Sequence, residues 1–500
     1  MGPNSNSPSE SSAPEQGTTA SPSTRWRQRV LVVLSLLVLP ACSMTRDRIG
    51  ELPIPEAGTF RLSNGVEVWH VPSNRVPMIN LSLVIGAGSS ADPPGKAGLA
   101  ALTLSMLEEG AGERDSLAFA DEIDFLGAAF SASADRDYST VQLEALRRNF
   151  DAALDLMADA VVRPRLEEKE WQRVKALWLN NLRLQSEQPG QIARRAGDRL
   201  FYGAGHPYAE AVDGRVDNVE GLTLKDVVAF NRTFVRPERA IFVCVGDLTE
   251  DELRVRLESR FGAWKGDAPE PGPIQFPQPE QLKDGQGLRI AVVNRPAAPQ
   301  TIIRVQLGAP SVFDERRPPL VLANLAFGGS ITSRLSTNLR KEHEYTYSAG
   351  SGLAPRFGPS YLVAQSAVIA EKTGPALREI CKELRRMSST ETLTPQEFQK
   401  ARSTHGVRLM KALQTQQAVL GFLVESAAGG QTPGERRGYH ARVQAQTVKT
   451  VHAESMRIFR WDRALVTLVG DQELIEQHLA ALRTAGEGAL DLPSAEIIAR

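Results

Sequence analysis

The sequence is poor in the residues from which covalent scaffolds and metal sites are built. Only three cysteines occur in 500 residues, which excludes a disulfide framework. The seven histidines are scattered: no two lie three or four positions apart and none accompanies a Cys-x-x-Cys, so a self-contained zinc site is not expected. Lys and Arg (58) balance Asp and Glu (59), and the net charge of -1 gives no electrostatic reason for nucleic-acid binding.

What remains is the composition of an ordinary folded protein. Hydrophobic residues make up 42% of the chain and charged residues 23%. The length allows roughly three domains with sizeable cores. Cys244 lies in an apolar run that predicts a buried strand, and Cys381 lies in a predicted helix. Both are therefore expected to be free, buried thiols.

The N-terminus has the pattern of a targeting segment. Residues 1–24 are rich in Ser, Pro, Gly and Thr and are expected to be disordered. Three arginines between positions 25 and 29 then precede the apolar run Val30–Leu39. This run is about half the ~20 residues that a transmembrane helix needs. The pattern predicts a signal peptide over residues 25–41.

The end of this segment, Leu39-Pro40-Ala41-Cys42, resembles a bacterial lipobox. In a lipobox the cysteine is acylated and becomes the new N-terminus, so Cys42 is the predicted lipidation site and residues 42–55 a tether. The resemblance, with Ser43 in the next position, implies a lipid-anchored protein of the bacterial envelope, on the periplasmic face of the outer membrane. The alternative is a plain secretory signal that is cut near Ala41.

From Phe60 onward, hydrophobic periodicity predicts alternating strands and helices. Strands are expected at Val66–Val71, Ile79–Gly86, Ala128–Asp135 and Ser139–Leu146, and helices at Ala97–Glu109, Leu117–Leu126, Phe150–Val162 and Glu167–Arg183.

A proline-rich stretch, Asp267–Gly287, interrupts this pattern and is typical of an interdomain linker. Beyond it the pattern recurs. Glu170-Trp171-Gln172-Arg173 has a counterpart in Glu397-Phe398-Gln399-Lys400, and the apolar strand Ala240–Asp247 has one in Ala464–Asp471. Both pairs are separated by roughly 225 residues, which indicates a duplicated α/β unit.

Four stretches of the first half carry a family resemblance. The stretches Arg61–Val66, Gly86–Ser89 and Pro93–Leu107, with His206-Pro207-Tyr208 further on, resemble the pitrilysin/insulinase-type (inverzincin) zinc metallopeptidases over about residues 56–480. The resemblance implies an α+β (layered α/β) fold. Two homologous halves of the LuxS/processing-peptidase type, with mixed or antiparallel sheets and helices, would form a clam-shell.

The expected organisation follows from these boundaries. It comprises a disordered extension (1–24), a signal peptide (25–41), a tether (42–55), an N-terminal peptidase-like domain (56–266), the linker (267–287), a C-terminal peptidase-like domain (288–484) and a tail (485–500).

The zinc motif of this family is missing from the sequence. Active members carry His-x-x-Glu-His on the helix after Gly-Leu-Ala, and a second Glu some seventy residues later completes the site. The matching positions here are Ala101, Leu104, Ser105 and Asn181. Alanine and leucine offer no lone pair, and neutral hydroxyl or amide oxygens are poor zinc ligands. We expect no metal, no cofactor and no catalytic residue in this chain. Glu108 and Glu109 are interpreted as exposed carboxylates rather than as replacements for the missing zinc-site residues.

The second half keeps another family feature. Gly328–Arg340 and Lys341–Tyr347 resemble the stretch from which an Arg and a Tyr, seven residues apart, hold substrate near the zinc of the other half. Arg340 and Tyr347 have this spacing and are the predicted substrate-binding residues, although Lys341 replaces the usual Glu. A guanidinium and a phenol can donate hydrogen bonds to peptide carbonyls without reading side chains. The structural alternative is a surface salt bridge for Arg340 and a strand position for Tyr347.

This asymmetry predicts a non-catalytic, substrate-binding subunit of a heterodimeric peptidase. Bacterial relatives of this size often occur as two chains, one with the zinc motif and one with the Arg/Tyr pair. The expected partners are a zinc-bearing homologous chain, an unfolded peptide and a membrane, but no nucleic acid. A non-proteolytic scaffold or peptide-binding protein of the envelope is the alternative. A third interpretation, a peptidase active on its own, predicts stoichiometric zinc in the purified chain.

Overall fold

The computed structural model describes residues 55–390, 393–484 and 489–498, which belong to one compact unit, Pro53–Arg500. The predicted extension, signal peptide and most of the tether, with Cys42, lie outside the described residues. In the described ranges, no helix is both long and apolar enough to span a membrane.

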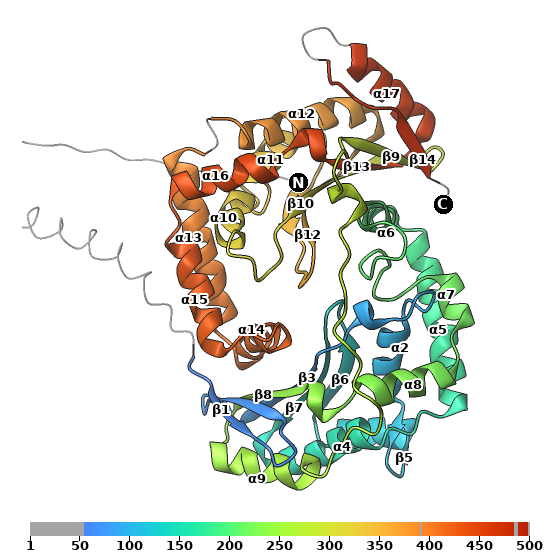
Figure 1. The fold of residues 1–500 in the computed structure, drawn as a ribbon, viewed down its shortest axis with the longest axis vertical. Coiled ribbons are helices and arrows are strands. Elements are labelled where there is room, and N and C mark those ends of the chain that lie inside the picture. The colour runs from blue at the N-terminus through green and yellow to red at the C-terminus, as the bar shows by residue number, and fades with distance from the viewer. Residues whose placement is uncertain (1–54, 391–392, 485–488, 499–500) are drawn as a thin grey trace, which may run out of the picture. The chain divides into compact units, whose positions relative to one another are not determined.

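The first half is built on a six-stranded sheet in the order β1-β2-β8-β3-β7-β6 (Figure 1). The pair β2 and β8 is parallel and the other neighbours are antiparallel, so the sheet is mixed. Strands β3 and β8 are almost entirely buried because they lie in the middle of the sheet. The strands are β1 (Gly58–Arg61), β2 (Glu67–Pro72), β3 (Met78–Ile85), β6 (Ala129–Ala134), β7 (Ser139–Leu146) and β8 (Ala240–Gly246).

The second half repeats this arrangement. Its sheet has the order β14-β9-β13-β10-β12-β11, which matches the first sheet position by position. The one difference in direction is at the edge, where β14 runs parallel to β9 while β1 runs antiparallel to β2. The strands are β9 (Arg289–Asn294), β10 (Gln300–Ala309), β11 (Ala349–Leu353), β12 (Ser360–Ile369), β13 (Leu465–Gly470) and β14 (Ala495–Ile498). The shared strand order agrees with the duplication that the sequence pattern predicts.

Helices cover both sheets. In the first half they are α2 (Leu99–Ser105), α3 (Ser116–Phe125), α4 (Phe150–Val162), α5 (Glu168–Ser186), α6 (Pro189–Tyr202), α7 (Val216–Gly221), α8 (Leu224–Phe234) and α9 (Glu250–Phe261). In the second half they are α10 (Arg317–Phe327), α11 (Arg334–Ser336), α12 (Thr373–Met387), α13 (Pro395–Ala412), α14 (Gln416–Ala428), α15 (Pro433–Gln444), α16 (Val448–Ile458) and α17 (Gln472–Thr484).

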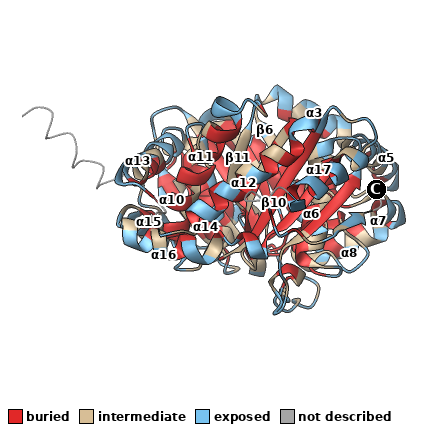
Figure 2. Ribbon diagram, turned by 90° about the horizontal axis from the view of Figure 1, so that it is seen from above, coloured by how far each residue is buried: buried red, intermediate tan, exposed pale blue. Residues whose placement is uncertain are grey.

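Capping boxes explain where several helices begin. The hydroxyls of Thr223, Thr249, Thr394 and Thr432 accept from the backbone N–H three residues later, and the acidic residue there accepts from the threonine backbone. Each box satisfies backbone donors that a helix start leaves open. Figure 2 shows buried residues running along the strands, whereas the surrounding helices are exposed on their outer sides.

Each half contributes one helix that covers the sheet of the other half. Helix α6 of the first half packs on β10 and β13 of the second sheet, and α14 of the second half packs on β3 and β8 of the first sheet. Ile192 and Ala193 of α6 lie in one apolar cluster with Ile302 and Val469 of the second sheet. Each sheet therefore depends on the other half for part of its cover.

The predicted elements are close to the observed ones, with one shortened helix. The helix expected at Ala97–Glu109 is only α2, followed by a 3-10 turn at Met106–Glu108. Gly98 precedes α2 with a φ of 98°, a left-handed conformation that favours glycine. Cys244 and Cys381 are free and buried, as expected.

The proline-rich segment 267–287 is not a free tether. It forms no helix or strand apart from a 3-10 turn at Glu280–Leu282. The Gln281 side chain is buried and donates to the carbonyl oxygens of Gly287 and Arg463 (2.9 and 3.2 Å). The Phe276 ring lies 4.7 Å from that of Tyr208 in the first half. The linker therefore docks on both halves.

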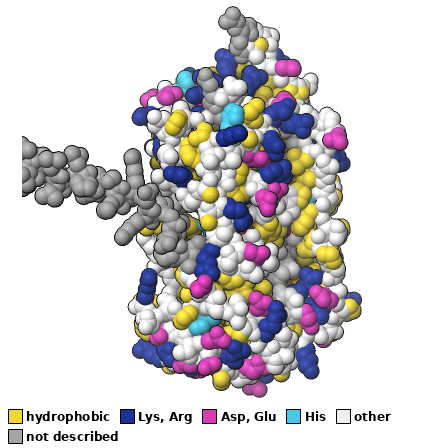
Figure 3. Space-filling view, turned by 60° about the vertical axis from the view of Figure 1, so that its left-hand side comes forward, with side chains coloured by type: hydrophobic (Ala, Val, Ile, Leu, Met, Phe, Trp, Pro, Cys, Tyr) yellow, Lys and Arg dark blue, Asp and Glu magenta, His cyan; other side chains and the backbone are white. Residues whose placement is uncertain are grey.

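Charges of both signs are distributed over the surface. On the face in Figure 3, basic and acidic side chains are interspersed. This distribution agrees with the balance of 58 basic against 59 acidic residues.

Candidate functional site

The predicted substrate-binding arginine lies on a distorted helical segment of the second half. Arg340 belongs to a π-helical turn, η7 (Thr337–Glu342), which continues α11. Leu335 and Leu339 of this segment are fully buried in the second core, whereas Arg340 is exposed. π-helical turns are rare and are frequently found at functional sites.

The tyrosine of the pair points into solvent. Tyr347 is 93% exposed, an uncommon position for an aromatic side chain. It follows Thr346, whose hydroxyl is turned inward to the carbonyl oxygens of Ser348 and Ala367 (2.9 and 2.6 Å). Among the described residues, neither the Arg340 guanidinium nor the Tyr347 hydroxyl has a hydrogen-bond partner. The salt bridge and the packed strand position of the structural alternative are therefore not observed.

Two polar anchors fix the segment that carries Arg340. Arg334 makes a bidentate ion pair with Glu397 on α13 (2.6 and 2.7 Å). The Asn338 amide donates to Glu379 and Glu383, neighbours on one face of α12 (2.8 and 3.0 Å). Both anchors reach helices outside the segment, so the backbone before Arg340 is held from two sides.

Electrostatics strengthen the first anchor. Burial alone would raise the pKa of Glu397, but the hydrogen bonds from Arg334 and from Thr394 outweigh it and lower the pKa to about 2. Glu397 also completes the capping box of α13 with Thr394. One carboxylate therefore starts a helix and holds the Arg340 segment at the same time.

The positions that match the zinc ligands do not form a polar site. Ala101 and Leu104 on α2 are 7% and 1% exposed, and Leu104 packs into the core under the first sheet. Ser105 is half-buried and Asn181 on α5 is exposed. Where α2 and α5 meet, the contacts are apolar and include Val174. The structure therefore brings these helices together around hydrophobic side chains.

The nearby carboxylates are committed to other partners. Glu108 accepts from the backbone N–H of Ala132 (2.8 Å), and burial raises its pKa. Glu109 forms an ion pair with Arg173 of α5. The His343 ring stacks on Tyr345 and lies 3.8 Å from Glu379.

A zinc ion does not fit this donor set. None of the four side chains carries an imidazole or a carboxylate, which are typical zinc ligands. They carry a methyl group, an isobutyl group, a hydroxymethyl group and a carboxamide. In the part of the chain that the structure describes, no three His, Cys, Asp or Glu side chains converge on a point where a metal ion could sit.

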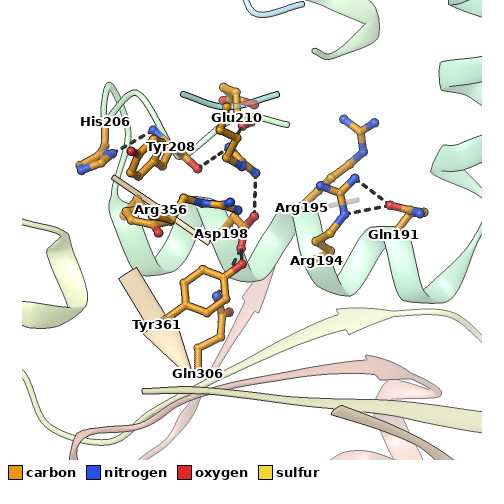
Figure 4. A network of polar contacts seen from close by, with 12 residues as sticks. Gln191, Arg194, Arg195, Asp198, His206, Tyr208, Glu210, Gln306, Arg356 and Tyr361 are labelled. Carbon is orange, nitrogen blue, oxygen red and sulfur yellow. Dashed lines mark hydrogen bonds and ion pairs between the residues drawn. The ribbon is translucent and has the colours of Figure 1, made fainter. Parts of the chain in front are cut away.

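A buried polar network that the sequence did not predict joins the halves (Figure 4). Its centre is Asp198 of α6, which is 1% exposed. Its carboxylate accepts from Arg136 of the first half (2.9 Å) and, from the second half, from Tyr361 (2.8 Å), Gln306 (3.3 Å) and Arg304 (3.4 Å). Buried charge is tolerated when it is paired and hydrogen-bonded in this way.

The motif His206-Pro207-Tyr208 forms a second junction. His206 accepts from the backbone N–H of Tyr208 (2.9 Å), and its other ring nitrogen contacts the carbonyl of Pro277 in the linker (3.1 Å). The Tyr208 hydroxyl donates to Asp137 and accepts from the backbone N–H of Gly358 in the second half (3.0 Å). This motif therefore connects the linker to both halves through hydrogen bonds.

Two of the scattered histidines meet inside the second half. His405 of α13 and His440 of α15 lie 3.3 Å apart between ring nitrogens, and both are buried. Burial lowers the pKa of His405 to about 4 and that of His440 to about 3. The pair is a neutral packing element, as expected for isolated histidines, but the contact itself has no signal in the sequence.

Two family models match the chain. The model described as Insulinase (Peptidase family M16) matches residues 71–196, and the model described as Peptidase M16 inactive domain matches residues 221–404. Together they match more than half of the sequence. The chain belongs to the insulinase (peptidase M16) family, and residues 221–404 match the domain type described as inactive.

Curated relatives are distant zinc proteases, most of them uncharacterized. The chain is 22% identical over 284 residues to an uncharacterized zinc protease of Mycobacterium leprae. This alignment covers 57% of this chain and 62% of the relative. It is 21% identical over 346 residues to one of Rickettsia bellii, which covers 69% of this chain and 80% of the relative. The first alignment thus spans less than two thirds of the relative.

Solved structures confirm the fold. A peptidase M16 inactive domain from Pseudomonas fluorescens superposes with a TM-score of 0.76 at 24% identity, covering 83% of this chain and 98% of that chain. A protease from Helicobacter pylori gives 0.78 at 19% identity, covering 83% and 100%. A chain of complex III2 from Candida albicans gives 0.70 at 17% identity, covering 87% and 100%.

Proposed function

We propose that this chain is the non-catalytic, substrate-binding subunit of a two-chain zinc metallopeptidase that degrades or processes peptides in the bacterial envelope. A homologous partner chain would hold the zinc ion, whose chemistry when bound would be the activation of water. This chain supplies Arg340 and Tyr347, which donate hydrogen bonds to the carbonyl oxygens of a bound peptide.

One contrast carries the proposal. The positions for zinc ligands hold Ala101, Leu104, Ser105 and Asn181, and the first two are buried in apolar surroundings. Arg340 and Tyr347, in contrast, are exposed, and their polar groups have no partner among the described residues. Two donors on an anchored segment are available to a ligand, whereas the means to activate water are missing from this chain.

The mode of action follows from the two side chains. A guanidinium and a phenol bind backbone carbonyls, which every peptide has, so they hold an unfolded chain without selecting its side chains. Next to a partner's zinc ion, the same donors stabilise negative charge that develops on the scissile carbonyl oxygen. Acylation of Cys42, together with a second acyl chain or with basic side chains that contact the lipid headgroups, would hold the complex at the periplasmic face of the outer membrane.

The test is reconstitution with a zinc-motif homologue from the same genome. Peptide cleavage by the mixture is measured with wild-type chain, Arg340→Ala and Tyr347→Phe, and we expect each substitution to lower kcat/KM at least tenfold. Lys341→Ala, an adjacent exposed cation, and Tyr345→Phe are the matched controls. Unchanged cleavage with both Arg340→Ala and Tyr347→Phe would show that the pair has no such role.

A second candidate is a non-proteolytic scaffold or peptide-binding protein of the envelope. The fold likeness to a chain of complex III2 from Candida albicans favours it. Pull-downs from envelope extracts distinguish the two: co-purification of a zinc-motif homologue supports the peptidase subunit, and stable partners that lack this motif support the scaffold.

A further inference from the structure

A large cavity lies between the two halves, away from Arg340 and Tyr347. It has a volume of about 980 Å³ and is bordered by α5, α6 and α7 of the first half and by β9 and β14 of the second. Its size is at the upper end of the range for ligand pockets. The larger apolar side chains that line it are Leu182, Ile192, Leu200, Val216, Val293 and Ile498.

The cavity borders on the edge strand of the second sheet. Ile498 of β14 is paired in register with Val293 of β9, so both side chains point to the face on which α6 packs. Ile497, the preceding residue of the strand, points to the opposite face, but it also lines the cavity and is 48% exposed. Two successive residues of the edge strand, one on each of its faces, therefore border the cavity.

Strand β14 offers unpaired backbone at this edge. It is the last strand of its sheet and, among the described strands, pairs only with β9. The edge is not protected by proline, lysine or a bulge, and its one charged residue, Glu496, contacts Arg289 (3.4 Å). Repeated N–H and C=O groups at an open edge are complementary to the backbone of another extended chain.

The charges around the cavity agree with such an occupant. Four guanidinium groups are balanced by four carboxylates, and some of them pair directly, as in Arg199–Glu210 (3.4 Å) and Arg215–Asp217 (2.7 Å). A balanced rim does not favour a phosphate or a metal ion. It complements a neutral peptide backbone with apolar side chains. The charged residues of the rim are Arg195, Arg199, Arg215, Arg289, Glu210, Asp217, Glu220 and Glu280.

We propose that this β14 groove, formed by β14 and the cavity beside it, binds an extended apolar segment of an unfolded polypeptide as an additional strand. The backbone of the segment pairs with β14, and its apolar side chains enter the cavity next to Ile497 and Ile498. Binding here needs neither a partner chain nor Arg340 and Tyr347, so the proposal does not depend on the role assigned to that pair.

The test is binding of a fluorescein-labelled peptide, Val-Thr-Val-Thr-Val-Thr, to the purified chain alone, followed by fluorescence anisotropy. We expect saturable binding that Ile497→Lys and Ala204→Trp each weaken at least tenfold. The first substitution places a charge at the edge, and the second fills the cavity from Ala204, an exposed residue of its lining. Leu117→Lys, at an exposed apolar residue outside the cavity lining, is the matched control and should bind the peptide like wild type, and thermal melting confirms that each variant is folded.

Hydrogen exchange on the unmodified chain locates the peptide independently of any variant. Added peptide should slow deuterium uptake in residues 489–498. Protection only at other strand edges, binding that survives both groove substitutions, or no binding at millimolar peptide would each overturn the proposal. A dimer that forms through this edge and is abolished by Ile497→Lys would identify a second copy as the occupant and would also overturn it.

Discussion

A carboxylate oxygen of Asp198 lies 3.4 Å from a guanidinium nitrogen of Arg304, although 106 positions separate these residues in the chain. The contact joins helix α6 of the first half to strand β10 of the second. Arg136 binds the other oxygen of the same carboxylate, so one buried anion serves two buried cations. The two halves are therefore coupled by charge as well as by apolar packing.

Removal of this carboxylate should strongly destabilise the protein. Asp198→Ala leaves the buried guanidinium groups of Arg136 and Arg304 without their anion, which typically costs about 3–5 kcal/mol. Urea unfolding measures the change. The matched control is Asp217→Ala, which breaks an exposed ion pair with Arg215 and should cost less than about 1 kcal/mol. Equal effects of the two substitutions would contradict the assigned role of Asp198.

The Tyr208 hydroxyl should matter for the junction of linker and halves. Tyr208→Phe removes the donor to Asp137 and the acceptor for Gly358 while keeping the ring that packs on Phe276. Leaving buried polar groups unsatisfied costs about 1–3 kcal/mol. We expect a lower unfolding midpoint and faster cleavage of the linker by added protease. Tyr345→Phe, which removes the hydroxyl of a half-buried tyrosine elsewhere, should leave the linker as resistant as in wild type.

The buried histidine pair should make stability depend on pH in the acidic range. Burial lowers the pKa of His405 to about 4 and that of His440 to about 3, whereas a histidine in an unfolded chain has a pKa of about 6.5. Between these values the unfolded chain binds more protons, so stability falls as the pH falls from about 6.5 toward 3. The melting temperature of wild type should drop more steeply over this range than that of the double variant His405→Phe/His440→Phe. Parallel curves would argue against the pair as the cause.

The folded protein should favour the ionised form of Glu397, whereas it disfavours the ionised form of the two histidines. Its pKa is lowered to about 2, because the contacts with Arg334 and Thr394 outweigh the effect of burial. The folded protein therefore prefers the anion, and this stabilisation is present above about pH 4.5 and is lost as the pH falls toward 2. Glu397→Gln should cost about 1–3 kcal/mol at neutral pH, and the difference from wild type should shrink below pH 4.5. A difference that is independent of pH would contradict this assignment.

The purified chain should contain far less than one zinc ion per molecule. Alanine and leucine at positions 101 and 104 provide no donor atom, and Ser105 and Asn181 provide only neutral oxygens. Elemental analysis after purification without chelator checks this expectation, with the zinc-motif partner as the positive control. One tightly bound zinc ion per chain would favour a peptidase that is active on its own.

Much of the local structure could be predicted from the sequence. The strand pair Ala128–Asp135 and Ser139–Leu146 and the helix Phe150–Val162 agree with β6, β7 and α4 within a residue. These segments have clear apolar periodicity and obvious turn residues at their ends. Short-range sequence patterns are therefore enough to predict their secondary structure. The equivalence of Trp171 and Phe398, both buried at matching places on α5 and α13, likewise follows from the repeated pattern.

The polar junctions could not be predicted in the same way. Asp198, Arg136 and Arg304 are far apart in the sequence, and Asp198 reaches Arg304 because α6 of the first half packs on β10 of the second. Helix periodicity shows that α6 has an apolar face, but not which sheet this face covers. The meeting of His405 and His440 depends in the same way on how α13 and α15 pack against each other. Local sequence carries no signal for such long-range pairings.

The exchanged helices make the two repeats mutually indispensable. If either repeat were produced by itself, an apolar sheet surface would face water, since the helix that shields it is encoded on the other side of the linker. Expression of one half without the other should therefore give an insoluble product rather than a smaller working protein.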